Sequence, residues 1–176
     1  MKLYKKSAYI GIFLSLAVVL SYIELILGFN ALMPVYGIKL GLYNILVITA
    51  IFYLGFTEAF LIIALRSIVM SVLFGSVTSF AFSFLGGLFS FLAMIILIKS
   101  SLFGKYISVI GVSIAGASFF NFGQIIASVI LTGRISMFYY LPVLLIGSVF
   151  TGTVIGITSK IILSYFGLIK LIGADR

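Results

Sequence analysis

The segment PVYGIKLGLYN, Pro34 to Asn44, determines how the rest of the chain is interpreted, because it interrupts otherwise continuous apolar sequence. Pro34 and Gly37 disfavour a regular helix, while Lys39 and Asn44 add a charge and an amide. Non-helical backbone at membrane depth is tolerated only where protein or a water-filled cavity satisfies its peptide groups. If the flanking stretches cross a membrane, the segment therefore predicts a cavity beside Lys39.

The composition of the 176-residue chain is that of an integral membrane protein. Hydrophobic residues make up 64% of it and charged residues only 8%, whereas soluble domains carry about 25% charged residues. Several stretches of about 20 apolar residues are long enough to cross roughly 30 Å of hydrocarbon, which favours helices over a strand barrel. We predict an all-α integral membrane protein in which residues 1–176 form a single polytopic domain.

The residue types that are missing exclude several kinds of chemistry. Cysteine and histidine are absent, and the acids are Glu24, Glu58 and Asp175, so thiolate metal sites, haem ligation by histidine and carboxylate clusters are hard to build. No GxxxxGK[ST] loop for ATP hydrolysis occurs. The net charge of +8 fits loops that face anionic lipid, not a nucleic-acid interface. We therefore predict no catalytic residues, no metal, no covalently bound cofactor and no nucleic-acid partner.

Six membrane-spanning helices are predicted, with a broken outer segment between the first and the second. The second is short for a full crossing unless it begins inside the broken segment. The predicted helices cover Ser7 to Leu27, Leu42 to Gly55, Glu58 to Phe74, Ser79 to Ile98, Tyr106 to Leu131 and Tyr139 to Tyr165.

The distribution of lysine and arginine predicts the orientation. With the N-terminus inside, eight basic residues lie on the inner side and two on the outer side, which is a strong positive-inside asymmetry. Both termini are therefore expected in the cytoplasm, with the chain in the cytoplasmic membrane. The inner set is Lys2, Lys5, Lys6, Lys99, Lys105, Lys160, Lys170 and Arg176, and the outer set is Lys39 and Arg134.

Polar residues inside the predicted helices are candidates for ligand contacts. Arg66 lies near mid-membrane, where arginine costs at least about 2.5 kcal/mol and should face the interior. Asn121 and Gln124 are three residues apart on one helix face and need partners, either in the cavity or on a neighbouring helix. Glu24, near the outer end of the first helix, either reaches interfacial water or lines the cavity. The predicted ligand-binding residues are Glu24, Lys39, Asn44, Arg66, Asn121 and Gln124.

The charges near the cavity suggest the sign of its ligand. Glu24 cannot neutralise both Lys39 and Arg66, so the cavity should retain positive potential, which favours a carboxylate or phosphate. The alternative is that Arg66 is tied to backbone carbonyls while Lys39 extends outward. Phenylalanines of the fourth predicted helix are interpreted as lipid-facing or core residues, with a stacking platform for a flat ring as the alternative.

Small residues recur at four-residue spacing in two predicted helices. Ser7, Gly11 and Ser15 share one face of the first helix, and the run from Ser148 to Gly156 repeats the pattern in the sixth. Such a face lets another helix approach closely. For the first helix, that neighbour is either part of the same bundle or a docking partner.

Several blocks of sequence carry a family resemblance. They are GIKLGLYN (Gly37 to Asn44), the helix with Arg66, FSFLGGLFS (Phe82 to Ser90), GVSIAGASFFNFGQ (Gly111 to Gln124) and YYLPVLLIGSVFTGTVIG (Tyr139 to Gly156). In this order they resemble the Gx transporter family, also labelled heptaprenyl diphosphate synthase component I, over nearly the whole chain. The chain departs from the family pattern at Phe120, where histidine is frequent, and at Tyr36, where proline is frequent.

The resemblance implies a function. The family resembles the substrate-binding S components of energy-coupling-factor transporters, which have six helices and pass a vitamin-like solute to an ATPase-driven module that docks partly on the first helix. Some Gx members are associated with flavin-based extracellular electron transfer and Rnf-like systems. We therefore expect an uptake subunit that is not an enzyme. The alternative is a subunit of an electron-transfer assembly with electron-transfer proteins as partners and a noncovalent flavin or quinone. The synthase label taken literally needs Mg²⁺ on clustered carboxylates, which three scattered acids do not supply.

Overall fold

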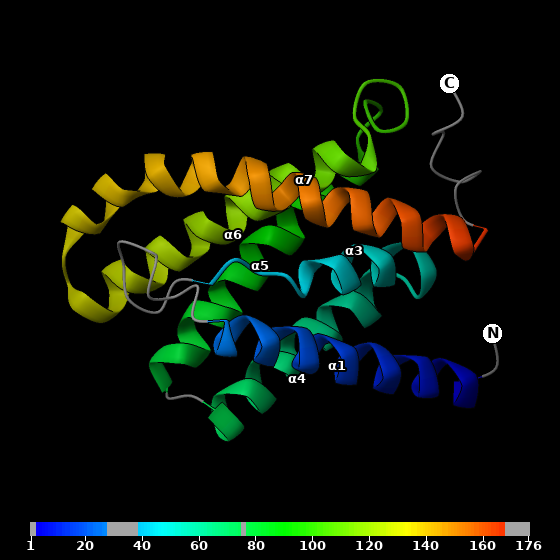
Figure 1. Cartoon of the computed structure of the whole chain (residues 1–176), viewed down its shortest axis with the longest axis horizontal. Helices are drawn as coiled ribbons and strands as arrows, with labels where there is room; N and C mark the ends of the chain where they lie inside the picture. The colour runs from blue at the N-terminus through cyan, green and yellow to red at the C-terminus, as the bar shows by residue number, and fades with distance from the viewer. Residues whose placement is uncertain (1–2, 28–38, 75–76, 168–176) are drawn as a thin grey trace.

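The computed structural model describes residues 3–27, 39–74 and 77–167, and helices make up most of these ranges (Figure 1). Within them there is no β-strand, only an isolated bridge between Phe103 and Ile107. Several residues used in the sequence predictions lie outside the described ranges, namely Lys2, Pro34, Tyr36, Gly37, Lys170, Asp175 and Arg176. The elements are α1 (Leu3–Ile26), α3 (Asn44–Tyr53), α4 (Phe56–Phe74), α5 (Val77–Lys99), α6 (Val109–Thr132), the 3-10 helix η1 (Ile135–Tyr140) and α7 (Leu141–Tyr165).

Five helical segments of the described chain are long and apolar enough to cross a membrane, which confirms an all-α, multi-pass architecture. The second predicted crossing, Leu42 to Gly55, is represented by the ten residues of α3. At 1.5 Å per residue α3 extends over only about 15 Å, half of the hydrocarbon thickness. Its short length follows from the residues before it, since the chain from Lys39 to Tyr43 is not helical.

The predicted starts of two helices, at about Tyr106 and about Tyr139, differ from the structure by three and two residues for local reasons. The predicted start at Tyr106 lies in a turn, and α6 begins after Ser108, whose hydroxyl accepts the N–H of Gly111 at 3.4 Å as an N-cap. The predicted start at Tyr139 falls inside η1, and α7 begins at Leu141 with Pro142 in its first turn, a position that suits proline.

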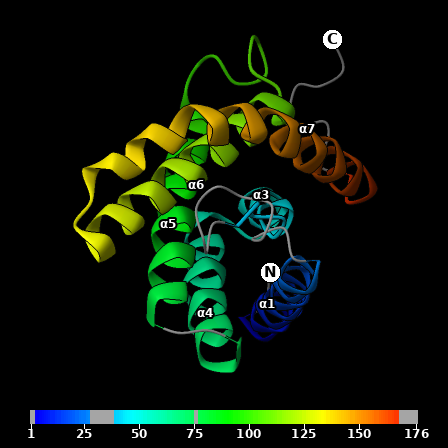
Figure 2. The same ribbon diagram turned by 60° about the vertical axis from the view of Figure 1, so that its left-hand side comes forward.

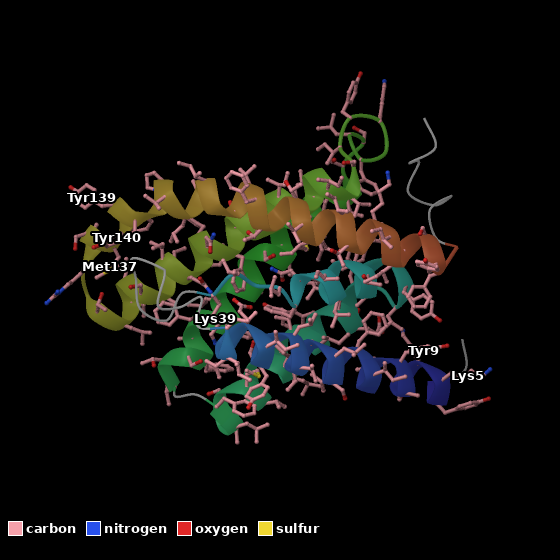
Figure 3. The ribbon with its side chains drawn as sticks, in the orientation of Figure 1. Lys5, Tyr9, Lys39, Met137, Tyr139 and Tyr140 are labelled. Atoms are coloured by element: carbon pink, nitrogen blue, oxygen red, sulfur yellow. The ribbon has the colours of Figure 1, made fainter. Side chains whose placement is uncertain are left out.

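The helices alternate in direction, so that α1 begins and α7 ends at one end of the bundle while η1 lies at the other (Figure 1). Figure 2 shows α3 enclosed between α1, α4 and α7, in agreement with its contacts to all three. Lys5 and Tyr9 lie at the first end, and Tyr139 and Tyr140 at the second (Figure 3). Lys39 is displaced toward the second end, which is the predicted outer side.

Glycines allow the backbones of α5, α6 and α7 to come into direct contact. A Cβ atom on Gly123 of α6 would lie 2.6 Å from the carbonyl oxygen of Leu85 in α5. One on Gly152 of α7 would lie 2.6 Å from the Cα of Ile114 in α6. The small-residue run from Ser148 to Gly156 therefore forms an internal interface.

The small residues of α1 lie on a face that points away from the rest of the bundle. Ser7, Gly11 and Ser15 are all exposed, and a Cβ atom on Gly11 would meet no atom within 4 Å. Packing of this face within the bundle, one of the two alternatives, is not observed among the described residues. Docking of a partner helix stays a prediction.

An ion pair joins α1 and α4 at the end where both helices begin. Lys6 Nζ lies 2.5 Å from Glu58 Oε1, with the two side chains 38% and 16% exposed. One turn further along α1, the rings of Tyr9 and Tyr53 meet edge to face at 5.2 Å between centroids. These two contacts hold the N-terminal end of α1, which lies farther from Lys39, against α3 and α4.

Candidate binding site

Glu24 holds the non-helical turn that precedes α3. Its side chain is 2% exposed, and its carboxylate accepts the N–H groups of Leu40, of Gly41 at 3.0 Å and of Leu42 at 3.2 Å. Gly41 has a φ of +78°, the left-handed conformation that glycine adopts at little cost. Successive N–H groups in such a turn converge on one anion. One of the two interpretations of Glu24 placed its carboxylate in interfacial water. The buried carboxylate instead binds the turn.

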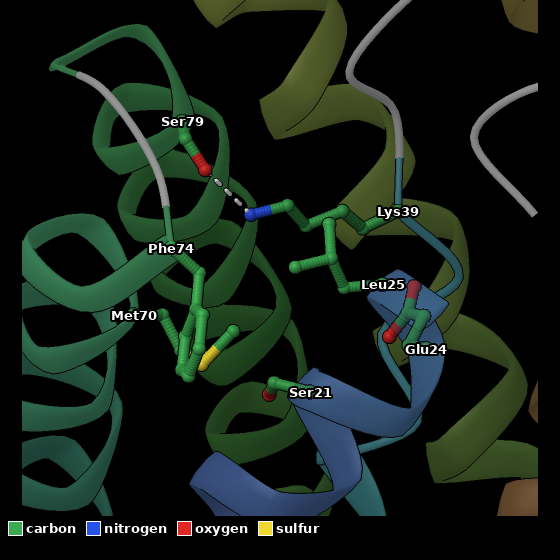
Figure 4. Close-up of a pocket in the computed structure, with 7 residues that line it drawn as sticks. All are labelled: Ser21, Glu24, Leu25, Lys39, Met70, Phe74 and Ser79. Atoms are coloured by element: carbon green, nitrogen blue, oxygen red, sulfur yellow. Dashed lines mark hydrogen bonds between the residues drawn. The ribbon is translucent and has the colours of Figure 1, made fainter. Parts of the chain in front are cut away.

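Lys39 connects the same turn to α5 and α6. Its N–H donates to Gln124 Oε1 at 3.2 Å, and its ammonium group donates to Ser79 Oγ at 2.9 Å and Ser83 Oγ at 2.7 Å. The side chain is partly buried and points inward along α5 (Figure 4). The residues from Lys39 to Leu42 are thus held by side chains from three different helices.

Arg66 lies in the interior, as its mid-helix position predicts. It is 1% exposed, and its Nε donates to Ser21 Oγ at 2.7 Å. The guanidinium carbon lies 3.8 Å from the ring centroid of Tyr43, a cation–π contact that is strongest where water is excluded. Its Nη1 has no hydrogen-bond partner in the described part of the chain.

Further buried polar atoms near the turn also have no partner among the described residues. They include Oδ1 and Nδ2 of Asn44, the hydroxyl of Tyr43 and Nε2 of Gln124. A Cβ on Gly41 would lie 2.9 Å from Asn44 Nδ2 and 3.0 Å from the Phe120 ring, and a Cβ on Gly86 would lie 2.9 Å from the same ring and 3.1 Å from Gln124 Cγ, so both amides lie near Phe120. Buried polar atoms are rarely left unpaired in native proteins. We use the name polar centre for Glu24, Lys39, Tyr43, Asn44, Arg66 and Gln124.

Asn121 does not join the polar centre. Its Nδ2 donates to the carbonyl oxygen of Leu144 at 3.0 Å, which ties α6 to α7. Residues three apart on a helix are rotated by about 60°, enough for Asn121 and Gln124 to face different neighbours. Five of the six predicted ligand-binding residues therefore lie together, and the sixth makes a structural hydrogen bond.

A cavity lies beside Lys39, where the broken segment predicts one (Figure 4). Its volume is about 10 Å³, near the lower limit for holding one water molecule. In this conformation the cavity is too small for a vitamin-sized solute. The lining residues are Ser21, Glu24, Leu25, Lys39, Met70, Phe74 and Ser79.

Sequence reasoning missed the hydroxyl partners of both cations. Ser21 precedes Glu24 by three residues and Ser79 precedes Ser83 by four, so helical spacing was a usable signal in each case. The proposed aromatic platform finds no support among the described contacts. Phe80 and Phe84 stack on each other at 5.4 Å between centroids, and neither lines the cavity.

Fold and site together define a polytopic helical membrane protein with a buried polar centre toward one end of the bundle. The family described as heptaprenyl diphosphate synthase component I matches residues 13–162, and the chain belongs to that family. No curated protein and no solved structure matches the chain.

Proposed function

We propose that the chain is a membrane substrate-binding subunit, similar to an S component, that captures a small vitamin-like or anionic solute for uptake driven by partner ATPases. The observation that supports this function best is the set of buried atoms on Asn44, Tyr43, Arg66 and Gln124 that have no hydrogen-bond partner within residues 3–27, 39–74 and 77–167. Polar and ionisable groups in an apolar bundle are expensive, and they usually mark the path or site of a solute. A solute that hydrogen-bonds these atoms would recover that cost.

In this proposal the structure represents the closed conformation. Capture begins when Lys39 leaves Ser79 and Ser83 and the turn ahead of α3 moves away from the polar centre. The ties that hold the turn are side-chain hydrogen bonds, each with a net contribution of about 1 kcal/mol, or about 1.5–3 kcal/mol where a charge takes part. A bound solute that replaces these bonds can therefore shift the equilibrium.

The chain itself catalyses no reaction in this proposal. Glu24 binds the backbone of the turn, while Glu58 pairs with Lys6 at the other end of α1. These two carboxylates do not face a common position, although the Mg²⁺ of a prenyl diphosphate synthase would need several oxygen ligands together.

Mass spectrometry of small molecules that remain bound to the purified protein tests this function. We expect a water-soluble solute in near-stoichiometric amount. A flavin or quinone in its place would favour the electron-transfer alternative, and a membrane-soluble quinone would contradict the uptake function.

We further propose six crossings with both termini in the cytoplasm, in which α3 and the segment before it form one crossing. Two exposed tyrosines make a matched test in this cysteine-free chain: Tyr106 is 73% exposed and Tyr139 is 85% exposed. A membrane-impermeant maleimide should label the Tyr139→Cys variant in intact cells, and the Tyr106→Cys variant only after permeabilisation. The reverse pattern, or labelling of both variants in intact cells, would show that the topology is wrong.

The exposed face of Ser7, Gly11 and Ser15 is the proposed docking surface for an energy-coupling membrane protein. Gly11→Leu should reduce co-purification of that partner several-fold, because a bulky side chain prevents close helix approach. Gly147→Leu is a matched control on α7, since a Cβ there also meets no atom within 4 Å. Equal recovery of the partner with both variants would count against the α1 surface.

A further inference from the structure

The polar centre has more positive than negative charge. Lys39 and Arg66 are both cations, and Glu24 is the acid beside them. Neither cation forms a salt bridge with a carboxylate in the described ranges, where the observed ion pair is the distant one between Lys6 and Glu58. The formal charge of Lys39, Arg66 and Glu24 together is therefore one positive unit.

Glu24 is hydrogen-bonded to the turn and to neither cation in the described contacts. Both of its carboxylate oxygens accept backbone N–H groups of the turn. Lys39 and Arg66 instead contact neutral hydroxyl groups, on Ser79 and Ser83 for the lysine and on Ser21 for the arginine. Neutral hydroxyls hydrogen-bond a cation without compensating its charge.

The small cavity is lined by Lys39 and is separated from Arg66 by Ser21. Lys39 and Ser79 line one side, and Ser21, the hydroxyl partner of Arg66, lines another (Figure 4). The remaining wall consists of the apolar side chains of Leu25, Met70 and Phe74 and of Glu24, whose carboxylate oxygens are hydrogen-bonded to the turn. Apolar walls lower the local dielectric and strengthen the attraction of an anion to both charges.

Among the described residues, the ammonium group of Lys39 has two acceptors and keeps one donor for such an anion. An ammonium group has three N–H donors, and the hydroxyl groups of Ser79 and Ser83 accept two of them. The hydroxyl of Ser21 donates its proton to the carbonyl oxygen of Ala17 at 2.7 Å. The donor to an anion in the cavity is therefore the ammonium group of Lys39 and not this hydroxyl.

We propose that this cavity binds one small monovalent anion. The ammonium group of Lys39 hydrogen-bonds the anion, and the positive charge of Arg66, which contacts Ser21, attracts it from a greater distance. The anion is either a free ion such as chloride or the carboxylate of the transported solute, and the latter identification rests on the proposed function. A volume of about 10 Å³ admits the anionic atom or oxygen alone, so the remainder of a larger solute must lie outside the cavity. One negative charge makes the occupied centre electrically neutral, which a dianion would not.

Thermal unfolding of the purified protein in detergent tests the site, with sodium formate, sodium chloride and sodium methanesulfonate compared at equal ionic strength. Formate is the probe for a carboxylate and chloride for an inorganic ion. Methanesulfonate is a monovalent anion whose oxygens lie on a bulky tetrahedral sulfur, which hinders the entry of one oxygen into a narrow cavity. Formate or chloride should raise the midpoint of the wild-type protein by roughly 2–4 °C over methanesulfonate, and the rise should saturate with concentration. Formate alone would indicate a carboxylate, and chloride alone a free ion.

Two variants locate the effect. Lys39→Gln should abolish the rise, and Lys105→Gln, which changes an exposed lysine between α5 and α6, should keep it. An equal rise in Lys39→Gln, or no saturating rise in wild type, would overturn the site, and the wild-type measurement decides even if Lys39→Gln does not fold. Retention of an uncharged solute with no anion effect would leave the proposed function intact and show that the anion site is wrong.

Discussion

Glu24→Gln is expected to lower the free energy of unfolding by about 2–4 kcal/mol. The amide keeps one acceptor oxygen but presents an NH₂ group to a turn whose N–H groups of Leu40, Gly41 and Leu42 all point at the carboxylate. At least one buried N–H then loses its acceptor, and the bonds that remain lose the contribution of the negative charge. Reversible unfolding in mixed detergent micelles measures the change.

Glu58→Gln is the matched control, because it makes the same chemical change at a partly exposed ion pair. Its loss of the contact with Lys6 should cost only about 0–1 kcal/mol, as for other solvent-accessible pairs. If the two glutamine variants lose the same stability, Glu24 is not the anchor of the turn.

Gly123→Ala is expected to destabilise the bundle by about 1–3 kcal/mol, although alanine is the better helix former by about 1 kcal/mol. The new methyl group would lie 2.6 Å from the carbonyl oxygen of Leu85 and 2.9 Å from the Cα of Gly86. Both atoms belong to the backbone of α5 and cannot rotate away, so α5 and α6 must separate. The same unfolding assay measures the loss.

Gly147→Ala provides the comparison for this substitution. A Cβ atom at Gly147 meets nothing within 4 Å, so its helix propensity acts alone and stability should stay equal or rise by up to about 1 kcal/mol. Equal destabilisation of the two alanine variants would contradict the close contact between α5 and α6.

The all-helical fold could be predicted because its signal is local. Apolar runs bounded by polar residues predicted the fourth helix as Ser79 to Ile98, within two residues of α5 at each end. The predicted helix Leu42 to Gly55 likewise lies within two residues of α3 at each end, whereas the contact of Glu24 with the turn before α3 could not be predicted, because Glu24 is distant in sequence.

The types of residue at the candidate site could be predicted from the sequence, but the hydrogen-bond partners of these residues could not. Lys39 and Arg66 stand out as charges in apolar sequence, whereas their serine partners resemble many other small residues of this chain. The small-residue pattern shows the same limit, since Gly152 packs against α6 and Gly11 faces outward. Spacing indicates that a close approach is allowed, and only the tertiary arrangement shows which helix makes it.

The central claim, that the polar centre binds a small solute, is tested most directly by equilibrium dialysis of the purified protein against a mixture of small molecules extracted from cells and medium. Gln124→Met removes an amide of the polar centre, and Asn121→Leu removes the neighbouring amide that bonds Leu144. We predict that wild type and Asn121→Leu enrich the same solute, and that Gln124→Met binds it at least roughly tenfold more weakly, the effect of about 1.4 kcal/mol. No enriched solute, or equal enrichment by Gln124→Met and wild type, would contradict the claim.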